Sequence, residues 1–182
     1  TPETGPMRMG MPISDLIAGC YAAMGTLAAL VRRQRTGQGE RVGASLVDGL
    51  VSMGAFASAN FLANGELPVP TGNDHSLVAP YGLFTACDGE IAIAPSNDAV
   101  YDKLLKALDL VHLREDPRFV TNALRVQHRA EINALVNDAV IRRDKATWIE
   151  QLNAAGVPCG TVMNLREVYQ DPQVLSQHML LE

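Results

Sequence analysis

The feature that most constrains this chain is a long apolar segment rich in glycine and alanine. It runs from Met11 to Leu30, and its small residues are Ala18, Gly19, Ala22, Ala23, Gly25, Ala28 and Ala29. Its pattern predicts a helix that ends near Arg35, with Gly37 as the C-terminal stop. Each glycine inside a helix costs about 1 kcal/mol relative to alanine. A helix that tolerates two of them is expected to meet another backbone, a second chain or a ligand at close range.

The start of this helix carries a carboxylate. Ser14 is the expected N-cap, because its hydroxyl can accept a hydrogen bond from one of the first free amides. Asp15 then falls in the first turn, where the positive end of the helix dipole favours an ionised side chain. Acidic residues are common in first turns, so position alone assigns no chemistry to Asp15.

The remaining elements follow from the spacing of apolar residues and of turn residues. Residues 40–45 are a short strand candidate, and residues 46–63 predict one helix, expected to be buried in a soluble protein because Asp48 and several Gly and Ser residues interrupt it. An Asp88-Gly89 turn predicts a hairpin of residues 83–87 and 90–94. Helices are expected over 97–108, 122–143 and 147–155, a third strand over 158–163, and two short helices from Asn164 and Asp171.

These elements predict an α/β protein in three parts. Residues 1–66 form a helical segment, residues 67–80 are a linker or loop rich in Pro, Gly, Asn and Asp, and residues 81–182 form a small α+β domain.

Charge and cysteine content narrow the functional classes. The net charge of −5 gives no attraction to nucleic acid or to an anionic membrane surface, and neither partner is expected. The three cysteines are scattered and lack the spacing of a metal site, which fits reduced thiols in a cytoplasmic protein. No metal ligands are predicted.

A second candidate site is the segment from Gly72 to Ser76. Small and polar residues there, Gly72 and Asn73 above all, can present backbone amides to an oxyanion or to a thioester. His75 in this segment is of a residue type that can act as a general base or contact a substrate. The alternative is an ordinary surface loop built from common turn residues.

Several motifs in one order resemble the class III CoA-transferases (the CaiB/BaiF family). They are Pro-Ile-x-Asp-x-x-Ala-Gly from Pro12, Arg-x-Arg-Thr-Gly-x-Gly from Arg33, Gly72-Asn-Asp-His75, Ala79-Pro-Tyr-Gly82, Asp116-Pro-Arg-Phe119 and Ala155-Gly-Val-Pro-Cys-Gly160. The resemblance implies that the first segment is the helical part of a large Rossmann-like domain. It implies that Asp15 is the catalytic nucleophile and that the loop with Gly72, Asn73 and His75, our candidate substrate- or CoA-binding residues, lies over the active site. This sequence lacks the run of glycines that some members have there, so the resemblance assigns no individual roles in the loop. The transferase cycle of the family needs no base on the enzyme, so His75 is expected to position or contact a substrate. It further implies an interlocked homodimer that acts on acyl-CoA and carboxylic acids, with coenzyme A thioester as substrate and no permanently bound cofactor.

Three functions remain open at this point. The first is transfer of CoA between carboxylic acids through an aspartyl anhydride and an aspartyl-CoA thioester. The second is racemisation or epimerisation of 2-methylacyl-CoA, in which an aspartate matching Asp15 would work with a histidine located before residue 1. The third is an inactive fragment or dimerisation module, because members of the family are about twice this long. In that case the isolated chain would bind little CoA and show no turnover. The sequence does not name the acids.

Overall fold

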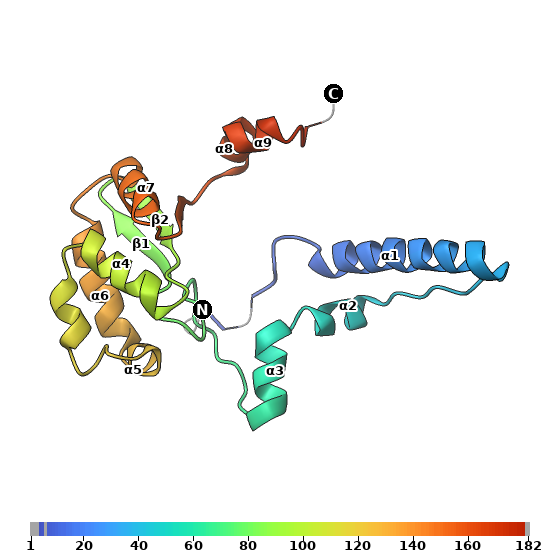
Figure 1. Cartoon of the computed structure of the whole chain (residues 1–182), viewed down its shortest axis with the longest axis horizontal. Coiled ribbons are helices and arrows are strands. Elements are labelled where there is room, and N and C mark those ends of the chain that lie inside the picture. The colour runs from blue at the N-terminus through green and yellow to red at the C-terminus, as the bar shows by residue number, and fades with distance from the viewer. Residues whose placement is uncertain (1–3, 6, 181–182) are drawn as a thin grey trace. The chain divides into compact units, whose positions relative to one another are not determined.

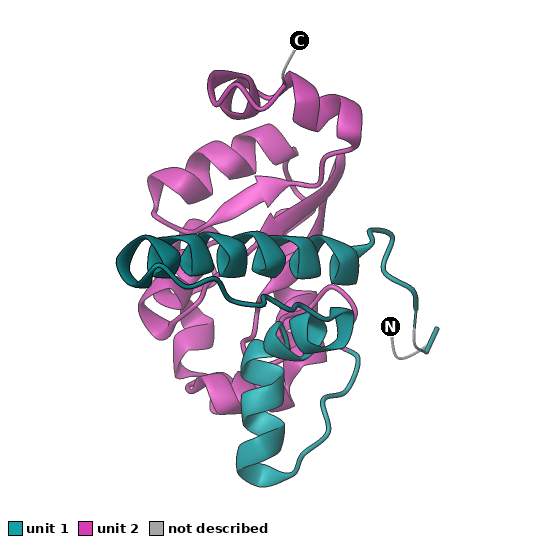
Figure 2. Cartoon of the chain, turned by 90° about the vertical axis from the view of Figure 1, so that its right-hand side faces the viewer, with its two compact units in different colours: residues 1–70 teal, residues 71–182 magenta. Residues whose placement is uncertain are grey.

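The computed structural model describes residues 4, 5 and 7–180 and divides the chain into two compact units. Unit 1 is residues 1–70 and unit 2 is residues 71–182. Figure 1 labels the helices and strands, and Figure 2 colours the two units. Unit 1 is helical, whereas unit 2 combines helices with a small antiparallel sheet, so the predicted mixed fold class is confirmed.

The first helix of unit 1 is α1, Ile13–Thr36. The amide of Leu16 donates to the carbonyl of Pro12, so the helix begins earlier than predicted and Ser14 is not its N-cap. Ser14 lies inside the first turn, and its hydroxyl donates to the carboxylate of Asp15. At the other end Gly37 adopts the left-handed conformation, with a φ of 72°, and donates to the carbonyl of Arg33. The predicted C-terminal stop is therefore confirmed.

The prediction of one helix over residues 46–63 is wrong. The structure has two helices, α2 Leu46–Ser52 and α3 Ala55–Asn64, whose axes differ by 76°. The chain leaves the helical path between them because Ala55 takes a φ of +42°, outside the right-handed helical region. Hydrophobic spacing continues across this point, so periodicity alone does not reveal the break.

Two further expectations for unit 1 are wrong. Residues 40–45 do not form a strand, because the described residues of unit 1 contain no other strand that could pair with them. Residues 46–63 are not buried as a helix either, since Gly49 alone among them is buried; Ile17 is the other buried residue in the described part of unit 1. These two residues meet where α1 packs on α2, since a Cβ on Gly49 would lie 3.0 Å from Cγ2 of Ile17.

Helix α1 is long enough and apolar enough to cross a membrane, and α2 with α3 meets the same criterion only as a bent pair.

The two glycines of α1 differ in their surroundings. A Cβ on Gly25 would lie 2.7 Å from Cγ1 of Val42, so a close approach inside unit 1 accounts for this glycine. A Cβ on Gly19 would meet no described atom within 4 Å.

Unit 2 contains a three-stranded antiparallel sheet in the order β1-β2-β3. Strands β1, Gly82–Ala86, and β2, Gly89–Ile93, form the hairpin predicted from Asp88-Gly89. Strand β3, Cys159–Thr161, pairs Thr161 with Ile91 and Cys159 with Ile93. The third predicted strand is therefore present in a shorter form.

Polar residues mark where the helices of unit 2 begin and end. They are α4 Asp98–Ala107, the 3-10 helix η1 Val111–Glu115, α5 Asn122–Gln127, α6 Arg129–Val140, α7 Lys145–Ala154, α8 Leu165–Gln170 and α9 Pro172–Ser176. The side chains of Asn97, Asn164 and Asp171 accept hydrogen bonds from first-turn amides, as predicted. The single helix predicted over 122–143 is wrong, because His128, with φ −101° and ψ 31°, separates α5 from α6.

Two apolar clusters fill unit 2. The first joins the sheet to α4, α6 and α7 through residues such as Phe84, Ile91, Leu104, Val136 and Trp148. The second lies on the other side of α4 and contains Ala79, Tyr101, Leu105, Leu113, Phe119 and Ile132. Because Ala79 belongs to the second cluster, the end of the segment that leads into β1 is anchored in the core.

A surface ion pair in unit 2 predicts a specific dependence of stability on pH. Both Asp116 carboxylate oxygens accept hydrogen bonds from the side chain of Arg118, at 3.0 and 2.7 Å. This contact, with the backbone amide of Arg118, lowers the pKa of Asp116 from 3.8 to about 2. A carboxylate whose pKa is lower in the folded state stabilises the fold above its ordinary pKa and loses that contribution as the pH falls.

We expect Asp116→Asn to lower the urea midpoint of unfolding near neutral pH and to converge with the wild type as the pH falls from 3.8 to about 2. Fluorescence of the single tryptophan, Trp148, buried in unit 2, reports the transition. Arg118→Gln should show the same convergence, because it removes the other partner. A constant difference between Asp116→Asn and wild type over this interval would contradict the assignment.

Candidate active site

Asp15 lies exposed in the first turn of α1. Its Oδ2 accepts a hydrogen bond of 3.2 Å from the hydroxyl of Ser14. The free amides of the first turn place partial positive charge near this carboxylate, which suits an anionic side chain. Asp15 is therefore an accessible carboxylate at a helix start.

The residues predicted to contact substrate lie together in one segment of unit 2, which we call the 71–81 loop (Thr71–Tyr81). Gly72 and Asn73 are exposed at its beginning, and Gly72 has a φ of +66°, which favours glycine. The loop closes on itself, because the amide of His75 donates to the carbonyl of Tyr81 at 2.9 Å. Asp15 belongs to unit 1 and this loop to unit 2.

The hydrogen bonding of His75 fixes which nitrogen of its neutral ring carries the proton. Its Nδ1 accepts a hydrogen bond of 3.1 Å from the amide of Leu77, and its ring lies 4.8 Å from the ring of Tyr81. Because Nδ1 is an acceptor, the neutral ring carries its proton on Nε2.

Sequence reasoning missed the residues that shape this loop. Arg125, Arg129 and Asn133 recur every four residues and all bind the 71–81 loop. Arg125 and Arg129 donate to backbone carbonyls, and Asn133 donates to the carboxylate of Asp74 at 3.1 Å. The available signal was the spacing, because polar residues at every fourth position would share one face of the helix expected over 122–143.

The described residues contain no group of three or more His, Cys, Asp or Glu side chains that could hold a metal ion.

Comparison with known proteins places the chain in a family. Residues 1–182 match the family described as CoA-transferase family III, and the chain therefore belongs to it. It is 31% identical over 182 residues to an acetyl-CoA:oxalate CoA-transferase of Acetobacter aceti, covering all of this chain and 47% of that protein. It is 30% identical to a human succinyl-CoA:glutarate CoA-transferase, covering all of this chain and 42% of that protein.

A solved structure gives the same result for the fold. A CaiB/BaiF family protein from Brucella suis matches 98% of this chain and 47% of its own length, with 32% identity and a TM-score of 0.77. The family resemblance inferred from the sequence motifs is thus confirmed. The relatives are named as CoA-transferases, which does not favour the racemase alternative. The chain spans about half the length of the curated relatives that it matches.

The His75 geometry predicts a single neutral tautomer. In alkaline solution, long-range proton–nitrogen NMR spectra of the chain should show His75 with a proton on Nε2 and an unprotonated Nδ1, because the amide of Leu77 donates to Nδ1. The exposed His178 serves as the internal reference. Predominance of the Nδ1–H tautomer at His75 would contradict the geometry.

Proposed function

We propose that the protein to which this chain belongs transfers CoA between carboxylic acids, with Asp15 as the nucleophile. The observation that carries this proposal is the match to CoA-transferase family III over residues 1–182. The names of the relatives support transfer rather than racemisation. Since the chain spans about half of each relative, the proposal concerns the protein that contains the whole catalytic site.

The proposed cycle uses no external base. An Oδ atom of Asp15 attacks the acyl carbon of the donor thioester, the C–S bond breaks, and CoA thiolate leaves behind a mixed anhydride. The thiolate attacks Cγ of Asp15, which releases the donor carboxylate and forms an aspartyl-CoA thioester. The acceptor carboxylate then attacks Cγ and expels CoA thiolate, and the thiolate attacks the acceptor's acyl carbon. This last step restores the Asp15 carboxylate, and the cycle neither consumes nor releases a proton.

The two candidate sites fit different parts of this cycle. A carboxylate is a weak nucleophile in water, so it needs positioning and removal of solvent at the moment of attack. The exposure of Asp15 in unit 1 supports a site completed by further protein and by the substrate. The 71–81 loop supplies exposed backbone at Gly72 and Asn73 as donors for thioester or carboxylate oxygens, and His75 lies beside them as a candidate substrate contact. Coenzyme A thioester is a substrate in this scheme, and no resident cofactor is proposed.

Substitution of Asp15 tests the mechanism. In the full-length protein, Asp15→Asn should reduce CoA exchange by roughly 10³-fold or more, because the amide cannot form the anhydride. Succinyl-CoA with glutarate and acetyl-CoA with oxalate are suitable pairs, since relatives are named for them. Asp48→Asn is the matched control, because Asp48 is also an exposed aspartate in a first turn of unit 1.

Hydroxylamine added during turnover should convert Asp15 into a hydroxamate that mass spectrometry detects, as expected for an activated aspartyl group. Full activity of Asp15→Asn would rule out the mechanism. Exchange of the α-proton of a 2-methylacyl-CoA with deuterated solvent, without CoA transfer, would indicate the racemase instead.

We also infer that the protein is a cytoplasmic homodimer in which other protein covers unit 1. The apolar side chains exposed on this unit support the inference, among them Leu16, Met24, Leu27, Val31, Val51, Phe56 and Leu62. Exposed apolar surface of this extent marks an interaction site. The open space around Gly19 suits close approach of another backbone. A protein partner also accounts for the apolar character of α1 without a membrane.

Charges on the exposed face of α1 should weaken the dimer. Leu27→Glu combined with Val31→Glu should shift the full-length protein from dimer toward monomer in sedimentation velocity, because an interface cannot desolvate these carboxylates at low cost. Leu165→Glu, a comparably exposed leucine of unit 2, is the control. A monomeric wild type would contradict the inference, and so would a double variant that remains dimeric.

A further inference from the structure

The backbone of the 71–81 loop is held by side chains from two helices. Four successive carbonyls accept hydrogen bonds from them. Arg129 donates to Ser76 at 3.3 Å and to Val78 at 3.0 Å, Asn122 donates to Leu77 at 2.8 Å, and Arg125 donates to Ala79 at 2.8 Å. Loops usually leave such carbonyls to water, so this degree of satisfaction by protein donors is unusual.

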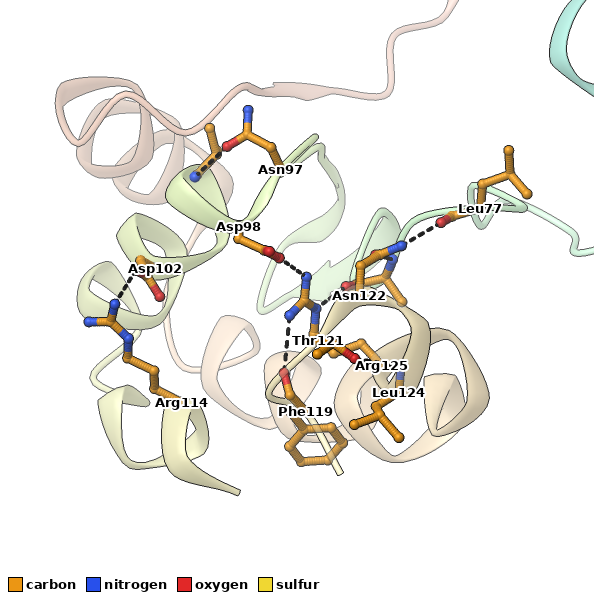
Figure 3. Close-up of polar contacts among 12 residues, drawn as sticks. Leu77, Asn97, Asp98, Asp102, Arg114, Phe119, Thr121, Asn122, Leu124 and Arg125 are labelled. Carbon is orange, nitrogen blue, oxygen red and sulfur yellow. Dashed lines mark hydrogen bonds and ion pairs between the residues drawn. The ribbon is translucent and has the colours of Figure 1, made fainter. Parts of the chain in front are cut away.

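Both the nitrogen and the oxygen of the Asn122 side-chain amide bind the loop. Its nitrogen donates to the carbonyl of Leu77, and its oxygen accepts from the amide of Ala79 at 3.3 Å. The side chain thus pairs with the loop backbone much as a neighbouring strand would. Figure 3 shows Asn122, at the start of α5, reaching across to Leu77.

Arg125 fixes the far end of the loop to the core. Its side chain is 2% exposed, and its guanidinium donates to the carbonyl of Phe119 and to the carboxylate of Asp98 as well as to Ala79. The guanidinium carbon also lies 4.1 Å from the ring centre of Tyr101. Figure 3 shows the contacts of Arg125 with Asp98 and Phe119. Removal of Arg125 would leave buried carbonyls unpaired, so this residue supports the fold itself.

The beginning of the loop is packed against the sheet. A Cβ on Gly82 would lie 2.4 Å from Oδ1 of Asp74 and 3.1 Å from the carbonyl oxygen of Asn73. Asn133 donates to the same Oδ1 of Asp74, and the hydroxyl of Thr71 donates to the carbonyl of Asp74 at 2.7 Å. The segment between Gly72 and His75 is therefore fixed on both sides.

We propose that Asn122 and Arg129 are positioning residues, which hold the 71–81 loop in the shape that binds the CoA thioester. This inference rests on the proposed function of the loop. Both side chains are half-buried and bind loop backbone, whereas Arg125 serves the core. Their removal frees residues 76–78, which directly follow His75, while both apolar clusters remain. They touch no reacting atom in the proposed cycle, so they act on substrate affinity more than on the chemical steps.

The first test follows the loop itself and needs no activity. In the 182-residue chain, Asn122→Ala should raise the hydrogen-exchange rate of the Ala79 amide, because Asn122 is its hydrogen-bond acceptor. The Thr85 amide, which donates to Asn137 at 2.8 Å, is the internal control and should keep its protection. Equal loss of protection at both amides would mean that the variant loosens the whole unit, which would overturn the positioning role of Asn122.

The second test separates affinity from chemistry in the full-length enzyme. Arg129→Met and Asn122→Ala should each raise KM for the acyl-CoA about tenfold, since each loses two hydrogen bonds to the loop. The effect on kcat should stay within about threefold. Arg129→Lys should recover part of the affinity, because an ammonium can still donate to a loop carbonyl. Arg114→Met is the matched control, since Arg114 pairs with Asp102 rather than with the loop.

The outcomes distinguish this inference from the proposed function. A fall in kcat at unchanged KM, no change in either constant, or an equal effect of Arg114→Met would overturn the positioning role while CoA transfer stands. If the wild type exchanges no CoA, the proposed function fails. Calorimetric titration of the same full-length variants with CoA then decides the positioning role. A tenfold weaker Kd in Arg129→Met supports it, and an unchanged Kd overturns it.

Discussion

The backbone carbonyls of a loop that runs close to a core must accept hydrogen bonds from some donor, and the arrangement of unit 2 depends on this requirement. In the 71–81 loop these donors are the side chains of Asn122, Arg125 and Arg129. Guanidinium groups suit the task because each offers several N–H groups in a fixed fork. The loop is thereby held in one shape without strand or helix hydrogen bonds of its own.

The break at His128 illustrates what sequence periodicity can and cannot reveal. Apolar spacing over residues 122–143 fits one helix, and the hydrogen-bond ladder almost continues through His128. The structure nevertheless has two helices there. Arg125 enters the core, while Arg129 reaches the loop. The same limit applies at Ala55, where the helical pattern persists but the backbone turns. Local signals with a chemical cause were more reliable, as the Asp-Gly hairpin and the Asn97 and Asn164 caps show.

The candidate site was predictable to different degrees in its two parts. The family motifs drew attention to Asp15 and to Gly72-Asn-Asp-His75 because these residues are contiguous with recognisable patterns. The supporting residues are 40 to 60 positions away from the loop in sequence, as with Asn122 to Leu77 and Asn133 to Asp74. A single sequence carries little information about such pairings. The strand expected over 40–45 failed for a related reason, because a strand depends on a partner that the segment itself does not specify.

The two units differ in how far each satisfies its own apolar surface, and this difference bears on the proposed chemistry. Unit 2 buries two apolar clusters and needs nothing further to hold its loop in place. Unit 1 buries Ile17 and Gly49 among its described residues and leaves Asp15 in solvent. An aspartate that must attack a thioester gains most when water is removed only after the substrate has arrived. The proposed cycle combines a nucleophile of this kind with a thioester-binding loop that its own unit holds in one shape. The binding loop then needs little ordering when the thioester binds, and binding energy remains available to desolvate the carboxylate.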